Sequence, residues 1–205
     1  FWSCAQSKNR EVEPSGIGWE LFKNYLIAKE RFKPDFFLYE NNVSAAPAIK
    51  EQIRKEFGVV YNPIYEHVPR YIEINSALVS AQKRKRFYVH NCGDVGQPKD
   101  RHIFLEDIIH LSDTDSMVAV IQRKHGDWKG GLKYGKSPTM TSMFWEQNNH
   151  LILPGKEKEV YEVKDGFITI KDKEYKTKLK DGLYHIRKFT TTECERLQTM
   201  PEGYT

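Results

Sequence analysis

The sequence contains few cysteines and no long apolar run. Its three cysteines, Cys4, Cys92 and Cys194, are widely spaced and form no Cys-x-x-Cys pair. Such a set cannot pair completely, which argues against a disulfide scaffold or a zinc finger and favours a reducing, cytoplasmic compartment. No apolar run approaches the ~18–20 residues that a membrane-spanning helix needs, and the first residues do not follow a signal-peptide pattern. We therefore expect no membrane association and no bound metal.

Aromatic and charged residues, in contrast, are plentiful. The chain has 205 residues, of which 39% are hydrophobic and 13% aromatic. This is enough for a buried core, and the length suits one large domain or one domain with a smaller module. Lys and Arg number 32 against 28 Asp and Glu, a net charge of +4. The small positive excess permits a polyanionic partner without requiring one.

Residues 1–90 alternate between helix and strand patterns. The expected elements are helices at 18–30 and 45–57 and strands at 36–39, 59–65, 72–79 and 85–90. This alternation predicts an α/β sheet. In open sheets of that class, ligands bind outside the carboxyl ends of the strands. Glu40 directly follows the expected strand 36–39, so we expect it at such an end.

The pattern changes to short strands between residues 112 and 186. The expected strands there are 117–121, 160–163 and 167–170. Asp165-Gly166 is a two-residue hairpin signal. Further on, Thr190 and Glu193 fit a capping box that begins a helix over 193–199. The expected organisation is therefore an α/β domain at 1–111, a β-rich region at 112–186 and a return to the α/β domain at 187–205.

Two polar clusters could carry chemistry. Glu40-Asn41-Asn42 combines a carboxylate with two amides, although such a trio is more simply a polar turn that caps the following helix. The second cluster is Gln82-Lys83-Arg84-Lys85-Arg86. Alternation on a strand would send Gln82, Arg84 and Arg86 to one face, where long donors suit a planar acceptor or a phosphate. The alternative is a solvated edge whose charges discourage strand pairing.

Taken in order, these segments resemble the DNA cytosine-5 methyltransferase family. Residues 37–43 resemble its Glu-Asn-Val segment, with one extra Asn, and residues 74–89 resemble its Gln-x-Arg-x-Arg segment. Residues 187–201 resemble the segment Arg-x-(Leu/Phe)-Thr…Glu-x-x-Arg-Leu-Gln-x-(Phe/Met)-Pro, and residues 136–141 its Pro-Thr-Leu-Thr element. The resemblance implies a partial Rossmann-like S-adenosylmethionine-dependent methyltransferase fold, with a small β-rich target-recognition region inserted or appended at 112–186.

The family's nucleophile segment, Pro-Cys-Gln, is not present. Trp2-Ser3 resembles the pair that follows it in the family, so we expect the nucleophilic Cys two residues before Phe1, outside this chain. The alternative nucleophile is Cys4, which Ala5-Gln6 follows. However, no Pro precedes Cys4, and the downstream match would then slip out of register.

Two further family segments, the Gly-rich cofactor loop and the Gly-Asn-(Ser/Gly) segment, are also missing. We therefore expect most of the S-adenosylmethionine site to lie outside this chain, with Leu21 as its one contact here. Residues 16–22 keep the Leu-Phe of the family's Gly-x-Arg-Ser-x-Leu-Phe helix start but not its Arg. No role of that Arg can be transferred to this chain.

The resemblance implies a role for each polar residue. In this family a Cys thiolate adds to carbon 6 of a flipped-out cytosine, which activates carbon 5 toward the methyl group. Glu40 would protonate N3, with burial raising its pKa, and Arg86 would neutralise the charge at O2. Arg84 would support the nucleophile region and a nearby phosphate. Gln82 and Asn41 would bind or orient the base.

Contacts to double-stranded DNA are expected outside this pocket. The expected phosphate contacts are Lys83 and Lys85, and the expected base-reading residues are Thr139, Met140, Thr141, Asn148 and Asn149. The leading hypothesis is a monomeric bacterial or phage enzyme of DNA methylation that belongs to a restriction–modification system, with a cognate restriction endonuclease at the level of the system, or is an orphan relative of such an enzyme. This chain alone is expected to be inactive. The alternatives are a catalytically incompetent DNA-binding remnant and, less favoured, an RNA cytosine methyltransferase.

Overall fold

The protein is a mixed α/β chain that forms two compact units. The computed structural model describes residues 11–61, 65, 67–109, 117–122, 130–140, 149–156 and 159–204. Unit 1 contains the described residues up to Asn75 together with Lys85–Pro98, and unit 2 contains Ser76–Arg84 and the described residues from Lys99 onward. The chain therefore divides at other places than the expected boundaries 111/112 and 186/187. The reason is that Ala81, Leu105 and Leu197 share one core with the β-rich region.

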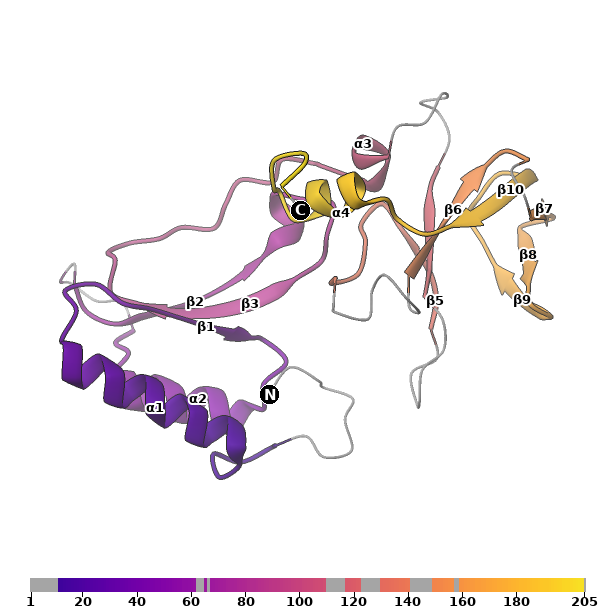
Figure 1. The fold of residues 1–205 in the computed structure, drawn as a ribbon. Coiled ribbons are helices and arrows are strands. Elements are labelled where there is room, and N and C mark those ends of the chain that lie inside the picture. Colours follow the sequence, from indigo (N-terminus) through magenta and orange to yellow (C-terminus); the bar gives the residue numbers. More distant parts are fainter. Residues whose placement is uncertain are drawn as a thin grey trace. The chain divides into compact units, whose positions relative to one another are not determined.

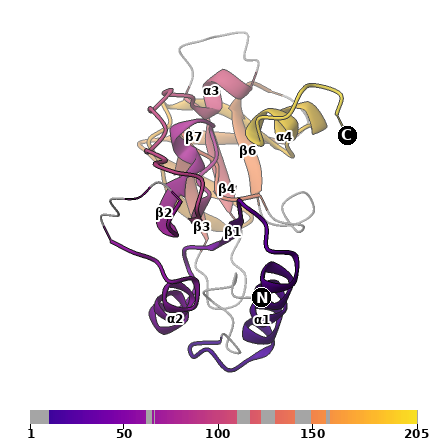
Figure 2. The ribbon, with the colours of Figure 1, turned by 90° about the vertical axis from the view of Figure 1, so that its left-hand side faces the viewer.

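Unit 1 is a three-stranded sheet with two helices on one of its faces (Figures 1 and 2). Its elements are α1 (Ile17–Phe32), β1 (Leu38–Asn42), α2 (Pro47–Phe57), β2 (Arg70–Asn75) and β3 (Lys85–His90). The strand order is β1-β3-β2, and β3 pairs antiparallel with both neighbours. β1 and β2 therefore run in the same direction, but the antiparallel β3 separates them. The expected ligand site at the carboxyl ends of neighbouring parallel strands therefore does not apply here, because every pair of neighbouring strands in this sheet is antiparallel.

Strand β1 differs from the expected strand 36–39. The backbone N–H of Phe37 donates to the Asn91 side chain (2.8 Å), whose amide in turn donates to the Asp35 carbonyl (2.8 Å). These side-chain contacts hold the chain before Leu38 outside the ladder, and pairing with β3 then continues through Asn42. Glu40 consequently lies within the strand and not beyond its end. The described residues of the expected strand 59–65 do not form a strand. Instead, the Val59 N–H donates to the Arg54 carbonyl, which is a contact of the end of α2.

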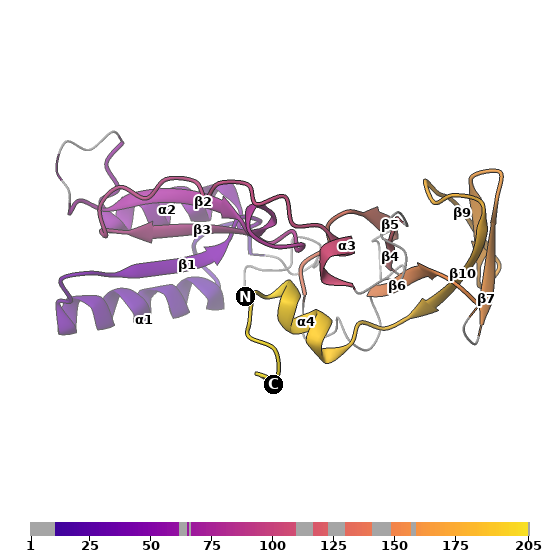
Figure 3. The same ribbon diagram turned by 90° about the horizontal axis from the view of Figure 1, so that it is seen from above.

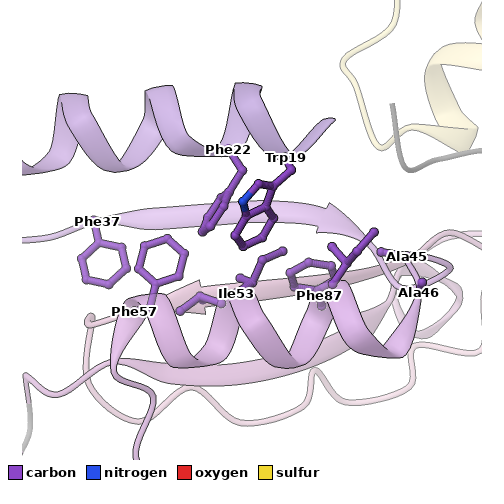
Figure 4. Close-up of a cluster of buried hydrophobic side chains, with 10 residues drawn as sticks. Trp19, Phe22, Phe37, Ala45, Ala46, Ile53, Phe57 and Phe87 are labelled. Atoms are coloured by element: carbon purple, nitrogen blue, oxygen red, sulfur yellow. The ribbon is translucent and has the colours of Figure 1, made fainter. Parts of the chain in front are cut away.

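The core of unit 1 is aromatic and lies between the helices and the sheet. Figure 4 shows Trp19 and Phe22 of α1 pointing toward α2, with Phe57 of α2 beside Phe37. The rings of Phe37 and Phe57 stack with their centroids 5.2 Å apart, and Phe22 meets Phe57 edge-on at 5.6 Å. Ile49, Ile53 and Phe57, spaced by four residues along α2, are all buried. Aromatic pairs of this kind add stabilisation beyond their buried area.

Unit 2 contains a seven-stranded antiparallel sheet (Figure 3). Its strands are β4 (Ala119–Gln122), β5 (Gly131–Tyr134), β6 (Asn149–Pro154), β7 (Val160–Lys164), β8 (Phe167–Ile170), β9 (Lys173–Lys176) and β10 (Gly182–Arg187). Their order is β5-β4-β6-β10-β7-β8-β9. The predicted hairpin turn at Asp165-Gly166 is confirmed. Both residues have positive φ, 51° and 77°, as a type I′ turn requires.

Three short helical segments complete unit 2: η1 (Ser76–Leu78), α3 (Leu105–Ile108) and α4 (Thr191–Leu197). The predicted capping box before α4 is confirmed, because the Thr190 hydroxyl accepts from the Glu193 N–H and the Glu193 carboxylate accepts from the Thr190 N–H. With Thr190 as the N-cap, the helix begins two residues before the expected start at Glu193. Among the described residues, no helix combines the length and apolar character needed to cross a bilayer.

Candidate functional site

The face of the unit 1 sheet opposite the helices carries an acid–guanidinium pair. Glu40 and Asn42 of β1 alternate with residues that face the core, and the register sets Asn42 opposite Arg86 of β3. The Glu40 carboxylate lies 2.7 Å from Arg86 Nε, and Arg86 Nη1 donates to the Asn42 side-chain oxygen (2.8 Å). Arg86 Nη1 also donates to the Lys85 carbonyl (2.9 Å). Two strands distant in sequence thus bring Glu40, Asn42 and Arg86 into one cluster.

The two charges of this pair differ in exposure. The Arg86 side chain is 13% exposed, whereas that of Glu40 is 42% exposed. The enclosed setting expected for Glu40 is therefore not present among the described residues. Its carboxylate acts here as a solvent-accessible hydrogen-bond acceptor. A ligand that approaches this face meets the carboxylate first and the guanidinium beside it.

Asn41, the expected substrate contact, belongs to the other face of β1. Its Nδ2 donates to the Tyr39 hydroxyl (2.9 Å), and its Oδ1 accepts from the Asn42 N–H (2.7 Å). Burial among aromatic rings raises the pKa of Tyr39 to about 12, so this hydroxyl is protonated at neutral pH. Asn42 is the amide that shares a face with Glu40. The two-residue period of a strand is the signal that would have identified it from the sequence.

The Gln82–Arg84 part of the basic cluster adopts a different structure from the expected strand. Gln82 forms an isolated parallel bridge with Ser137. The Lys83 N–H donates to the Ser137 carbonyl (2.8 Å), and the Ser137 N–H donates to the Ala81 carbonyl (2.6 Å). Only Lys85 and Arg86 lie in β3. The expectation that one strand turns Gln82, Arg84 and Arg86 to a common face is therefore wrong.

This bridge joins two segments for which different roles were expected, one at the target base and one in reading the neighbouring bases. The Thr139 hydroxyl donates to the Lys83 carbonyl (2.6 Å), so the Pro-Thr element of the β-rich region contacts the Gln-Lys-Arg segment directly. Lys83 and Lys85 are exposed, as phosphate contacts would need to be. Gln82 itself is buried.

The other predicted base-reading residues are dispersed. Met140 packs partly buried against a core cluster of unit 2. Asn149 lies in β6 opposite Gln122 and is only 4% exposed, so it cannot reach a base edge in this structure. Thr141 and Asn148 lie outside the described residues. Among the described members of this group, only Thr139 forms a hydrogen bond with the Gln82–Arg84 segment.

Lys136 fastens the Ser76–Arg84 segment to the rest of unit 2. Its ammonium group donates to the carbonyls of Ala77 (2.7 Å), Ser80 (3.1 Å) and Ile103, and it lies 4.9 Å from the centre of the Phe104 ring. An ammonium group has three N–H donors, so each can meet one carbonyl. Sequence reasoning assigned Lys136 no role, because a lone Lys two residues before a Pro carries no signal of its own.

We expect Lys136→Met to destabilise the chain by about 2 kcal/mol, because three carbonyls lose their common donor. Lys136→Arg should not restore stability, since a planar guanidinium cannot direct its donors as an ammonium does. Urea unfolding measures both. The matched control is Lys133→Met, three residues earlier and exposed, which should change the free energy of unfolding by less than about 0.5 kcal/mol. Equal effects at both positions would contradict the anchoring role.

The segment that leads into α4 is held by a partly buried ion pair. Arg187 Nη1 and Nη2 donate to the two carboxylate oxygens of Glu193 (2.8 and 2.6 Å). Burial alone would raise the pKa of Glu193, but the bonds from Arg187 and from the Thr190 backbone outweigh it and lower that pKa below its usual value. Arg196 extends the connection, donating to the Ile108 carbonyl (3.0 Å) and to Glu202. The Arg, Thr, Glu and Arg residues of the 187–201 segment thus have structural contacts here.

The lowered pKa of Glu193 predicts a loss of stability in acid. A carboxyl group whose pKa is lower in the folded state contributes stability above its unfolded pKa, and the contribution disappears as pH falls through the folded pKa. We expect Glu193→Gln to cost about 2 kcal/mol at pH 7, and the difference from the unmodified chain to shrink as the pH falls below ~4.5. Unfolding curves at a series of pH values measure it. Glu20→Gln is the control, because the Glu20 carboxylate is exposed and pairs with Lys23 at the surface of α1. A Glu193 effect independent of pH would count against the ion pair.

The described residues contribute little to a cofactor or metal site. They contain no group of three or more His, Cys, Asp or Glu side chains that could hold a metal ion. Leu21, the expected contact of S-adenosylmethionine, is 44% exposed on α1, one turn after the exposed Ile17. These two side chains offer an apolar surface but no enclosing pocket, so the residues described here do not by themselves fit the cofactor.

Comparisons with known proteins do not identify a relative. No protein-family model matches the chain. No curated protein matches it either. What the chain does must therefore be inferred from its own residues and their arrangement.

Proposed function

We propose that this chain is part of a DNA cytosine-5 methyltransferase, which transfers a methyl group to carbon 5 of a cytosine flipped out of double-stranded DNA. The observation that carries the proposal is the contact between Glu40 and Arg86, 2.7 Å apart. The resemblance assigns these residues to N3 and O2, which lie on the same edge of the cytosine ring. Two groups that act on neighbouring positions of one small ring must themselves be neighbours.

The arrangement of unit 1 supports a partial Rossmann-like methyltransferase fold. β1 and β2 run in the same direction and are connected through α2. Parallel strands joined by a helix are the repeating element of such folds. The antiparallel β3 between them is a departure from a wholly parallel sheet. Strands β4–β10 all fall between Ala119 and Arg187, which supports a target-recognition role for the β-rich region.

The proposed reaction requires one acid and one fixed cation beside the cytosine ring. Addition of a thiolate to carbon 6 places negative charge on the ring at N3 and O2. Glu40 must be protonated when the base is bound; it then delivers that proton to N3 as a general acid, and the guanidinium of Arg86 stabilises the charge at O2. The thiolate belongs to the Cys that the resemblance assigns to the position two residues before Phe1. S-adenosylmethionine, when bound, supplies the methyl group; loss of the carbon 5 proton to a base and departure of the thiolate then restore the ring.

Asn42 and the Lys85 carbonyl orient Arg86. Both accept hydrogen bonds from Nη1 (2.8 and 2.9 Å), which limits rotation of the guanidinium plane before a base arrives. A preformed donor costs no reorganisation during the reaction. Exposed Lys83 and Lys85 bind phosphates of the DNA and offset part of the few kcal/mol that base flipping costs.

The partners and the compartment proposed for this activity are those expected from the sequence. The partner is double-stranded DNA, the enzyme is a monomer of the cytoplasm, and a restriction endonuclease of matching specificity is its partner in a restriction–modification system. The scarcity of cysteine suits a reducing compartment.

The test is methyl transfer by the protein encoded by the gene together with its flanking coding sequence. Duplex DNA is incubated with S-adenosylmethionine that carries a labelled methyl group, digested to nucleosides and analysed for 5-methylcytosine. Labelled 5-methylcytosine supports the proposal. A protein that is folded and binds DNA but leaves cytosine unlabelled would be the DNA-binding remnant, and label found only in RNA would indicate an RNA methyltransferase. Either result rejects the proposed activity.

A further inference from the structure

A polar cavity of about 230 Å³ lies within unit 2, next to the Gln82–Arg84 segment. Its lining residues are Ser76, Val79, Ser80, Gln82, Arg84, Leu197, Gln198 and Thr199. One wall is the segment before β3, and the other is the end of α4 with the two residues that follow. None of these lining residues is a carboxylate. The polar side chains that line it are therefore hydroxyls, amides and one guanidinium.

The wall from Ser76 to Arg84 is held by its own hydrogen bonds. The Ser76 hydroxyl donates to the Gln82 carbonyl (2.8 Å), and the Gln82 N–H donates to the Ser80 hydroxyl (3.1 Å). The Ser76 N–H donates to the Arg84 carbonyl (3.0 Å). With Lys136 fastened to the Ala77 and Ser80 carbonyls, the backbone that carries Gln82 and Arg84 is fixed before any ligand enters.

The opposite wall is equally ordered. The backbone N–H groups of Gln198, Thr199 and Met200 donate to the carbonyls at the end of α4, those of Cys194, Glu195 and Arg196. Because these carbonyls already accept hydrogen bonds from backbone N–H groups, they do not repel an anion in the cavity. Thr199 adopts a left-handed conformation (φ 59°), an uncommon one for a β-branched residue.

One buried donor in this cavity has no acceptor. Gln82 is only 2% exposed, and its Nε2 forms no hydrogen bond with any described residue. A buried polar group without a partner is unfavourable, and nearly all such groups in folded proteins are satisfied. Arg84, on the same lining, forms no salt bridge in the described part of the chain. An amide donor and a cationic donor thus face the same space.

We propose that this cavity is a phosphate site, which holds one phosphodiester group of the DNA backbone between the Gln82 amide and the Arg84 guanidinium. A phosphate has only acceptor oxygens, so it matches a cavity whose side chains offer donors and no carboxylate. The inference rests on the proposed function for its DNA, but it changes one assignment. Gln82 contacts the backbone of the strand and not the target base.

The test is DNA affinity measured against salt concentration, using the 205-residue chain and a labelled cytosine-containing duplex. The slope of log K against log salt reports how many phosphates are neutralised. Arg84→Gln should lower its magnitude by about 1, whereas Gln82→Leu should weaken binding at least tenfold with an unchanged slope, because it removes a neutral donor to a charged group. Arg31→Gln and Gln52→Leu, both in unit 1 helices, are the matched controls and should alter neither quantity.

A second measurement identifies the phosphate and guards against misfolding of Gln82→Leu. A set of duplexes, each with one neutral methylphosphonate in place of a phosphate, is bound to the unmodified chain and to Arg84→Gln. At one position the replacement should weaken DNA binding by the unmodified chain but not by Arg84→Gln, because the effects of removing two groups that contact each other do not add. Absence of such a position, or absence of DNA binding, would overturn the proposal.

This binding experiment is independent of methyl transfer. If the enzyme assay fails while Arg84→Gln still lowers the salt slope, the cavity remains a phosphate site on a DNA-binding protein. If methyl transfer succeeds, but Arg84→Gln leaves the salt slope unchanged and no methylphosphonate position distinguishes it from the unmodified chain, the proposed enzyme activity is supported and the assignment of this cavity is wrong.

Discussion

Glu40→Gln should reduce methyl transfer by a factor of about 10²–10⁴, the usual contribution of a general acid, while DNA binding stays measurable. Gln has nearly the same shape as Glu but has no acidic proton to deliver to N3. The measurement is the single-turnover rate of methyl transfer by the protein expressed with its flanking coding sequence, together with its affinity for the same duplex.

The position of Glu40 makes this a clean test. The residue lies on the outer face of β1, with its side chain 42% exposed, so the substitution should not disturb the aromatic core on the opposite face. Glu162→Gln on the exposed part of β7 is a control for the loss of one surface carboxylate. Methyl transfer by Glu40→Gln at the rate of the unmodified enzyme would reject the N3 role.

Arg86→Ala should lower turnover by about 10²–10³, the range seen when one donor to a developing oxyanion is removed. Lys85→Ala should lower it by less than about threefold. The contrast follows from the structure: Arg86 is 13% exposed and bonded to both Glu40 and Asn42, whereas Lys85 is exposed, and surface pairs with phosphate contribute little individually.

Arg86→Lys separates charge from geometry. An ammonium keeps the positive charge but cannot meet Glu40 and Asn42 in the fixed fork of a guanidinium, so turnover should fall between those of Arg86→Ala and the unmodified enzyme. Thermal unfolding of each variant shows whether a loss of rate is a loss of fold. A larger effect of Lys85→Ala than of Arg86→Ala would overturn the assignment of Arg86 to the base.

Local patterns were sufficient for the elements whose signals are short-range. The capping box at Thr190 and Glu193, the Asp165-Gly166 turn and the helix expected at 45–57, which is α2 at Pro47–Phe57, are all confirmed. Each depends on residues within four positions of one another, where capping, turn conformation and helix periodicity decide the outcome.

Longer-range contacts overrode the pattern elsewhere. β1 was expected to end before Glu40, but Asn91, far along the chain, holds the backbone before Leu38 and shifts the strand forward. The basic run was expected to form one strand, yet Ser137 pairs with the backbone around Gln82 and separates it from β3. A local sequence pattern does not indicate partners as distant in sequence as Asn91 is from Phe37 or Ser137 from Gln82.

The amino-acid order was enough to suggest which residue types act together: an acid after an aromatic strand, a run of Gln, Lys and Arg, and a Thr-capped helix. Only the folded chain decided that Asn42, and not Asn41, supports Arg86, and that Gln82 is buried beside a cavity with its amide unpaired. The physical reason is that residue identity sets what a side chain can bind, whereas strand register and the packing of distant segments set which groups it can reach.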